Sequence, residues 1–181
     1  MKSTHFTILI IDDSPTDQTL IVRAFRRNDV TNRIVCLDCG EEAIAYLNGV
    51  GQYADRTRFP YPTFIITDLK MPRGDGLSVL ENLKKNPEWA VIPTVVLTAS
   101  DDPDDIKKSY MLGASSYFVK SKGFDHLLRQ TKILYDYWSE SETPEVDVTG
   151  KRLKTESIGR LGERFAQGET EDATRAHNLS R

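Results

Sequence analysis

The hydrophobic residues of the first three-quarters of the chain are concentrated in five short segments, and within each segment most of them follow one another without alternation. Consecutive apolar residues, many of them β-branched, are typical of strands that are buried on both faces of a sheet. The predicted strands span residues 6–11, 33–37, 63–67, 94–97 and 116–119.

Helical patterns separate these strands. Ser14 and Pro15 predict an N-cap with a proline in the first turn of a helix, whose apolar face would consist of Leu20, Ile21, Ala24 and Phe25. Further helices are expected over residues 41–47 and 77–85, from Pro103 to a stop at Gly113, and over residues 124 to about 138. Strands that alternate with helices predict a parallel sheet with right-handed crossovers, so residues 5 to about 139 are expected to form an open α/β sandwich.

Two segments depart from this alternation. Residues 48–61 are longer than the connection that a compact domain needs, and we expect either a mobile loop or an extension of the second helix. From about residue 140 the chain becomes polar and mixed in charge. We therefore predict a folded domain over residues 1–139 and a flexible polar tail over residues 140–181, with a short partner-binding helix in the tail as the alternative.

The composition argues against two classes of protein, those that bind nucleic acids and those that associate with membranes. The chain has 24 Lys and Arg against 27 Asp and Glu, and a net charge of −3 gives no support to direct nucleic-acid binding. We expect no membrane association and a cytoplasmic location, because no apolar run is long enough to cross a bilayer and the N-terminal apolar stretch becomes acidic too soon for a signal peptide. Cys36 and Cys39 are interpreted as small apolar residues at a strand end, with a redox pair as the alternative.

Chemically active side chains follow the ends of four predicted strands. Asp12 and Asp13 follow the first strand, Asp68 the third, Thr98 the fourth and Lys120 the fifth. In an open parallel sheet, ligands bind beyond the carboxyl ends of the strands, where the winding direction reverses. These three acids, the hydroxyl and the ammonium are therefore expected to meet at one edge of the sheet.

A divalent cation explains the clustering of acids. Close carboxylates repel one another by about 1–4 kcal/mol for each pair near a protein surface. Mg2+ prefers oxygen ligands and usually takes one or two carboxylates together with a phosphate oxygen. One of the three acids is then free to accept a phosphoryl group, with Thr98 and Lys120 contacting the phosphoryl oxygens.

The order of four motifs gives a family resemblance. The segments "IIDDS", "ITDLKMPRGDG", "VVLTAS" and "SYFVKS" together resemble the receiver domain of two-component response regulators, over residues 6 to about 138. The resemblance implies a flavodoxin-like, doubly wound five-stranded parallel sheet in the order 2-1-3-4-5, with helices on both faces. The long loop before the third strand and the "YDYW" segment also resemble the small single-domain regulators associated with bacterial phytochrome kinases.

The resemblance assigns roles to individual residues. It implies that Asp68 is the phosphoacceptor, that Asp13 is a direct Mg2+ ligand and that Asp12 binds the ion through water. Lys70 would contribute its backbone carbonyl to the metal, and Lys120 would contact the phosphate.

The resemblance also implies a switch and a shaped loop. Thr98 and Tyr117 match the family's switch pair, in which the hydroxyl moves to the phosphate and the aromatic ring turns inward. The residues that would shape the loop after the acceptor are Met71, Pro72, Gly74 and Gly76, whereas Asp75 is interpreted as a turn residue. Ser121 stands where the family usually has a proline in a cis peptide, and the sequence leaves a cis or a trans Lys120–Ser121 bond open.

The expected function is that of a stand-alone response regulator. It would accept a phosphoryl group from a sensor histidine kinase, with a bacterial phytochrome as a candidate kinase, and would then switch partner binding or relay the group. It would not be an enzyme beyond supporting its own phosphotransfer and slow autodephosphorylation. The apolar residues Tyr110, Ile133 and Tyr137 favour a partner surface, and members of the phytochrome-associated group tend to form homodimers through the fourth and fifth helices. The alternative is a phosphorylation-independent adaptor with the same fold.

Overall fold

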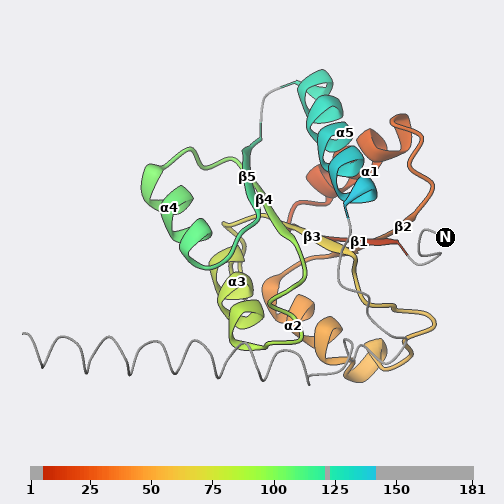
Figure 1. Ribbon diagram of the computed structural model, residues 1–181, viewed down its shortest axis with the longest axis vertical. Helices are drawn as coiled ribbons and strands as arrows, with labels where there is room; N and C mark the ends of the chain where they lie inside the picture. Colours follow the sequence, from red (N-terminus) through yellow and green to blue (C-terminus); the bar gives the residue numbers. More distant parts are fainter. Residues whose placement is uncertain (1–5, 121–122, 142–181) are drawn as a thin grey trace, which may run out of the picture. The chain divides into compact units, whose positions relative to one another are not determined.

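A single parallel sheet forms the centre of the described part of the chain. The computed structural model describes residues 6–120 and 123–141. Within these residues, five strands are arranged in the order β2-β1-β3-β4-β5, and every neighbouring pair is parallel (Figure 1). The strands are β1 (Thr7–Ile11), β2 (Arg33–Leu37), β3 (Phe64–Thr67), β4 (Thr94–Thr98) and β5 (Ser116–Val119). The predicted fold class and strand order are confirmed.

Helices follow the strands along the chain, as predicted. They are α1 (Pro15–Arg27), α2 (Gly40–Asn48), α3 (Gly76–Lys85), α4 (Pro103–Met111) and α5 (Phe124–Glu140). In Figure 1, α1 and α5 cover one face of the sheet, and α2 and α3 cover the other. The first helix begins as expected, because Ser14 is the N-cap and its hydroxyl accepts a hydrogen bond from the Asp17 amide.

The side chains of β1 divide the core into two halves. Ile8 and Ile10 pack with Phe25 of α1 and Leu134 of α5, whereas Leu9 and Ile11 pack on the side of α2 and α3. All residues of β1, β3 and β4 are buried. The expectation of burial on both faces is wrong for β2 and β5, because every residue in them except Leu37 is at least partly exposed. Each of these strands has a neighbouring strand on one side only.

Of the two alternatives for residues 48–61, a mobile loop or an extension of the second helix, the structure shows a loop, and the mobility of that loop stays a prediction. An extension of α2 is wrong, because the helix ends at Asn48 and Gly49 adopts the left-handed conformation with φ of 64°. The segment is a loop that contains a short 3-10 helix, η1 (Gly51–Tyr53). The Tyr53 ring is buried in the core, and the Arg56 guanidinium donates hydrogen bonds to carbonyl oxygens in the last turn of α2.

Two predictions concern residues outside the described ones. The polar tail predicted over residues 140–181 lies beyond them apart from its first two residues, so its boundary and its flexibility stay predictions. Ser121 also lies outside, and the Lys120–Ser121 bond therefore stays open. No helix within residues 6–120 and 123–141 has the length and apolar character needed to span a membrane.

Candidate functional site

The strand ends hold the predicted site residues in register. The backbone N–H of Asp12 donates to the Leu37 carbonyl at 3.0 Å, and that of Asp68 donates to the Ile11 carbonyl at 2.9 Å. The N–H of Lys120 donates to the Thr98 carbonyl at 2.6 Å. These bonds continue the sheet by one residue beyond the strands. Three residues far apart in the sequence are thereby fixed at one edge.

Lys120 is the centre of this group. Its Nζ lies 2.7 Å from Oδ2 of Asp12, 2.8 Å from Oδ2 of Asp68 and 2.7 Å from Oδ2 of Asp17. Burial alone would lower the pKa of the Lys120 ammonium, but its hydrogen bonds to the three carboxylates raise that pKa above its ordinary value. The ammonium therefore stays charged and partly neutralises the acids around it.

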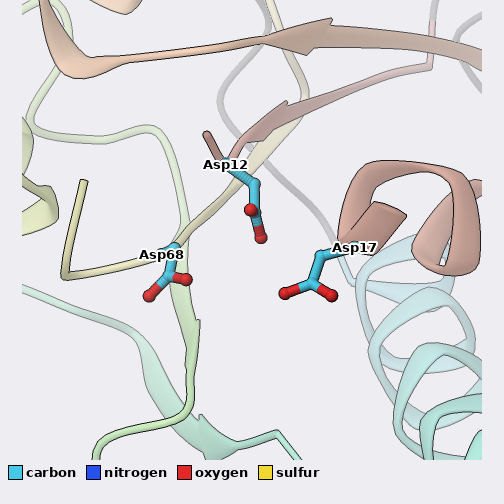
Figure 2. Close-up of side chains that lie close together, drawn as sticks. All are labelled: Asp12, Asp17 and Asp68. Atoms are coloured by element: carbon cyan, nitrogen blue, oxygen red, sulfur yellow. The ribbon is translucent and has the colours of Figure 1, made fainter. Parts of the chain in front are cut away.

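Three carboxylates converge from three elements. Asp12 follows β1, Asp68 follows β3 and Asp17 lies in the first turn of α1 (Figure 2). One carboxylate oxygen from each residue lies within 4.8 Å of those from the other two. Asp17 was not among the predicted site residues. The one signal for it in the sequence is its position on the helix that starts directly after the Asp12–Asp13 pair. Because the sequence does not give the direction of its side chain, Asp17 cannot be distinguished there from an ordinary acid near a helix N-terminus.

Asp12 is the most deeply buried of the three acids. Its residue surface is 1% exposed, and its Oδ1 accepts a hydrogen bond from the Ser14 amide at 2.9 Å. Burial raises the pKa of the Asp12 carboxyl above its ordinary value, against the opposing effect of Lys120 and the Ser14 amide. The Gln18 amide group, also unforeseen, donates to the Asp12 carbonyl at 2.6 Å. The first turn of α1 thus positions both Asp12 and Asp17.

The loop after β3 orients Asp68. The Leu69 amide donates to Oδ1 of Asp68 at 2.6 Å, which leaves Oδ2 directed to Lys120. The loop closes where the Gly76 N–H donates to the Leu69 carbonyl at 2.9 Å. Asp75, interpreted as a turn residue, is the N-cap of α3 and accepts a hydrogen bond from the Ser78 amide at 2.8 Å.

The predicted switch residues lie beside this group. Thr98 is buried at the end of β4, and its hydroxyl makes a long contact of 3.4 Å with the Ser100 amide. The Tyr117 ring is half-buried against the cluster that contains Leu80 and Val96, and its hydroxyl donates to the Ser100 carbonyl at 3.0 Å. Burial raises the pKa of Tyr117 above its ordinary value, so the hydroxyl remains a donor at neutral pH.

A second small network joins α4 to this region. The Ser100 hydroxyl donates to Oδ2 of Asp105 at 2.6 Å, and this bond, with Lys70 nearby, lowers the pKa of the Asp105 carboxyl. The Lys70 ammonium lies 3.5 Å from the same carboxylate oxygen, and its side chain is 71% exposed. The side chain of Lys70 is thus occupied outside the acid group, in keeping with the prediction that it contributes only its backbone.

Not every predicted residue joins the group. Asp13 is exposed and is absent from the carboxylate group that the described residues form, so its role as a metal ligand stays a prediction. Cys36 and Cys39 are free thiols. Cys36 packs on the side of α1 and α5, and Cys39 is buried as the N-cap of α2, which favours the interpretation as small apolar residues.

The donor set fits a hard divalent cation. Three carboxylates and one ammonium carry a formal charge of −3 + 1 = −2, which one divalent cation would neutralise. All the side-chain ligands in the group are carboxylate oxygens, the donors that Mg2+ and Mn2+ favour over the nitrogen and sulfur preferred by softer metals.

Comparisons with known proteins agree with this geometry. The model of the response regulator receiver domain matches residues 8–132. The chain is 33% identical over 136 residues to the response regulator Rcp1 of Synechocystis sp., a match that covers 75% of this chain and 90% of Rcp1.

Two solved structures are similar to this fold. The phosphorylated cyanobacterial phytochrome response regulator RcpA is 34% identical with a TM-score of 0.73, over 78% of this chain and 100% of that one. The Mn2+-bound form of Rcp1 is 32% identical with a TM-score of 0.70, over 77% of this chain and 99% of that one. The receiver motifs and the family resemblance inferred from them are thus confirmed, and the chain belongs to the response regulator receiver domain family of two-component signalling.

Proposed function

We propose that the protein is a stand-alone response regulator that accepts a phosphoryl group on Asp68 from the phosphohistidine of a sensor kinase. The observation that carries this proposal is the position of Lys120, whose Nζ lies 2.8 Å from Oδ2 of Asp68 and 2.7 Å from Oδ2 of Asp12. A charged ammonium beside the acceptor carboxylate can neutralise charge on a phosphoryl group formed there.

The transfer exchanges one bond for another. The N–P bond of the phosphohistidine breaks and leaves its electron pair on the imidazole nitrogen, while a carboxylate oxygen of Asp68 forms the new O–P bond. The Leu69 amide, which donates to Oδ1 of Asp68 at 2.6 Å, fixes the orientation of that carboxylate. The Lys120 ammonium, which contacts Oδ2 of Asp68 before the transfer, would contact the phosphoryl oxygens after it.

The metal in this proposal is Mg2+. Asp12, Asp13 and Asp68 would hold it with the backbone carbonyl of Lys70, Asp12 acting through water. Bound Mg2+ would supply positive charge that offsets the negative charge on the oxygens of the transferring phosphoryl group. Support comes from the charge of −2 on the described group and from the Mn2+-bound structure of Rcp1.

Phosphorylation would be read out by Thr98 and Tyr117. Among residues 6–120 and 123–141, the 3.4 Å contact with the Ser100 amide is the one that holds the Thr98 hydroxyl, so its rotation toward a phosphoryl group on Asp68 costs little. The loop that carries Ser100 would then shift, and the Tyr117 hydroxyl would lose its bond to the Ser100 carbonyl, which frees the ring to turn inward. The phosphoryl group thereby acts as a ligand with different affinities for two states.

The partners in this proposal are inferred in part from the proteins that this chain resembles. The similarity to the phytochrome response regulator RcpA favours a phytochrome-type sensor kinase as the phosphodonor and a cytoplasmic location. The output surface would lie on α4 and α5, where Tyr110, Ile133 and Tyr137 are 50%, 58% and 63% exposed, and a homodimer through these helices is one form of that contact. The protein would not bind nucleic acid directly and would hydrolyse its own acyl phosphate slowly.

Incubation with a small acyl phosphate and Mg2+ tests the proposal. Intact-protein mass spectrometry should detect one added phosphoryl group on the native protein and none on Asp68→Asn. Asp29→Asn is the matched control, because it makes the same charge change at an exposed site after α1, where asparagine tolerates the φ of 58°. Modification that persists in Asp68→Asn would remove Asp68 from its role.

The adaptor alternative predicts a different result. A phosphorylation-independent adaptor would bind its partner with the same affinity with and without beryllofluoride, which mimics a phosphoryl group. Under the proposed function the affinity changes, because the mimic shifts the population of the two states.

A further inference from the structure

Lys120 is held by one acid more than the proposed phosphotransfer needs. Two of its partners have roles in the proposed function: Asp12 helps to hold the metal, and Asp68 is the phosphoacceptor. The third partner, Asp17, lies as close to Lys120 as Asp12 does, at 2.7 Å. Figure 2 shows its carboxylate turned from α1 toward the other two. Neither the acceptor role nor the proposed metal ligands account for this contact.

The start of α1 fixes Asp17 in this position. Ser14 is the N-cap, and its hydroxyl accepts a hydrogen bond from the Asp17 amide at 3.2 Å. An acid three residues after an N-cap commonly reaches back to the N-cap amide, but here the Ser14 amide donates to Asp12 instead. The Asp17 carboxylate is therefore available to Lys120. Its place in the first turn also stabilises its negative charge.

The three partners of Lys120 differ in what it costs to release them. The side chains of Asp12 and Asp68 are only 2% and 12% exposed, whereas that of Asp17 is 36% exposed. Backbone amides also hold the two less exposed carboxylates. The Ser14 amide donates to Oδ1 of Asp12, and the Leu69 amide donates to Oδ1 of Asp68. Since water can solvate the Asp17 carboxylate, its separation from Lys120 is the least costly of the three.

We propose that Asp17 is a positioning residue that holds the Lys120 ammonium in the unphosphorylated site and releases it when a phosphoryl group forms on Asp68. The inference rests on the proposed function, since it assigns Lys120 to the phosphoryl oxygens. The Asp17–Lys120 ion pair stabilises the unphosphorylated state alone. Its presence therefore weakens the phosphorylated state relative to the unphosphorylated one.

Beryllofluoride binding tests this role without requiring turnover. Bound mimic is measured by 19F NMR at an Mg2+ concentration that saturates each variant, after a separate Mg2+ titration. Asp17→Asn and Asp17→Ala should bind the mimic about fivefold more tightly than the native protein, because a partly exposed ion pair is lost from the unphosphorylated state only. Asp29→Asn, with the same charge change at the far end of α1, should bind as the native protein does.

A double-mutant cycle separates the ion pair from simple charge repulsion. In a Lys120→Gln background, Asp17→Asn should change mimic binding by less than about twofold, because the partner of Asp17 is absent. An equal gain in both backgrounds would mean that Asp17 acts through its own charge on the mimic, and would overturn the proposal.

The outcomes distinguish this inference from the proposed function. A merely structural role for Asp17 predicts weaker or unchanged binding in both Asp17 variants, and either result overturns the inference while the native protein still binds the mimic. If the native protein binds no mimic in the presence of Mg2+, the proposed function fails, and the role of Asp17 fails with it.

Discussion

The carbonyl oxygen of Asp68 lies so close to Gly76 that a Cβ atom on residue 76 would approach it to 2.1 Å. The carbonyl carbon of Asp68 and the Cα atom of Leu69 would each lie 2.9 Å from the same Cβ atom. These neighbours are backbone atoms, which cannot move aside as the end of a flexible side chain can. The position of the acceptor therefore depends on the absence of a side chain eight residues further along a closed loop.

Substitution Gly76→Ala is expected to destabilise the fold and displace Asp68. The added methyl group forces the loop away from α3, at a cost of about 2 kcal/mol or more. The phosphorylation rate with a small acyl phosphate should fall further than the loss of folded protein explains, because Asp68 no longer faces Lys120. Thermal unfolding and time-resolved mass spectrometry measure the two effects.

Gly123→Ala is the matched control for this substitution. Among the described residues, a Cβ atom on Gly123 meets nothing within 4 Å, and the residue is the N-cap of α5 with φ of −129°, which alanine adopts readily. The free energy of unfolding should differ from that of the native protein by about 1 kcal/mol or less, because alanine is the poorer N-cap residue but also restricts the unfolded chain. Equal stability and equal phosphorylation of both variants would contradict the importance of the close approach.

The raised pKa of Asp12 predicts how stability depends on pH. Burial is its main cause, so the folded protein binds more protons than the unfolded chain between the ordinary pKa and the raised one. The contribution of Asp12 to the free energy of unfolding therefore falls as pH rises from about 4 through the raised pKa. Asp12→Asn removes this term, and its stability should improve relative to the native protein over that range.

Urea unfolding from pH 4 to 7, in the presence of a chelator, measures this difference. Asparagine keeps an oxygen for the Ser14 amide, and Lys120 keeps Asp17 and Asp68 as partners. The variant therefore changes the charge more than the packing. Parallel stability curves for the two proteins would show that Asp12 costs no stability as a buried carboxylate.

Much of the fold is predictable because the central strands are buried on both faces. Burial from both sides requires nearly continuous apolar residues, as in the β1 segment from Ile8 to Ile11, and such runs are visible without a structure. The segment after α2 was harder to interpret. Tyr53 lies in the core, Phe59 and Tyr61 pack against it, and the rings of Tyr53 and Phe59 contact each other, a role that has no fixed spacing along the chain.

The site was predictable where the backbone alone places a residue. Asp12, Asp68 and Lys120 follow parallel strands, so their meeting depends on topology and not on side-chain conformation. Asp17 and Gln18 belong to a helix, where the direction of the first turn decides whether a side chain points to the site or to solvent. That direction depends on the N-cap contacts of Ser14, which no sequence pattern specifies in three dimensions.

Thr98 is expected to matter for the phosphorylated state more than for folding. Within the part of the chain that the structure describes, its buried hydroxyl makes a single contact, of 3.4 Å with the Ser100 amide, so Thr98→Val should change the free energy of unfolding by about 1 kcal/mol or less. Beryllofluoride should bind Thr98→Val about fivefold more weakly, since the mimic loses a hydrogen-bond donor.

Thr98→Ser provides the matched control, because it keeps the hydroxyl and loses a methyl group. Its affinity for beryllofluoride should be within about twofold of that of the native protein, although Thr98→Ser fills the site less well than Thr98→Val does. If the serine and valine variants bind the mimic equally, the hydroxyl of Thr98 makes no contact with it.

Arg56 is expected to anchor the segment after α2 through a geometry that lysine cannot reproduce. Its guanidinium donates to the Tyr46 and Leu47 carbonyls, each at 2.7 Å, and stacks 4.0 Å from the centroid of the Tyr61 ring. Arg56→Lys should lower the free energy of unfolding by about 2 kcal/mol, because one ammonium cannot satisfy both carbonyls and the ring. Arg58→Lys, at an exposed arginine of the same segment, should change it by about 0.5 kcal/mol or less. Urea unfolding compares the two variants, and equal stabilities would mean that the Arg56 contacts do not hold this segment against the core.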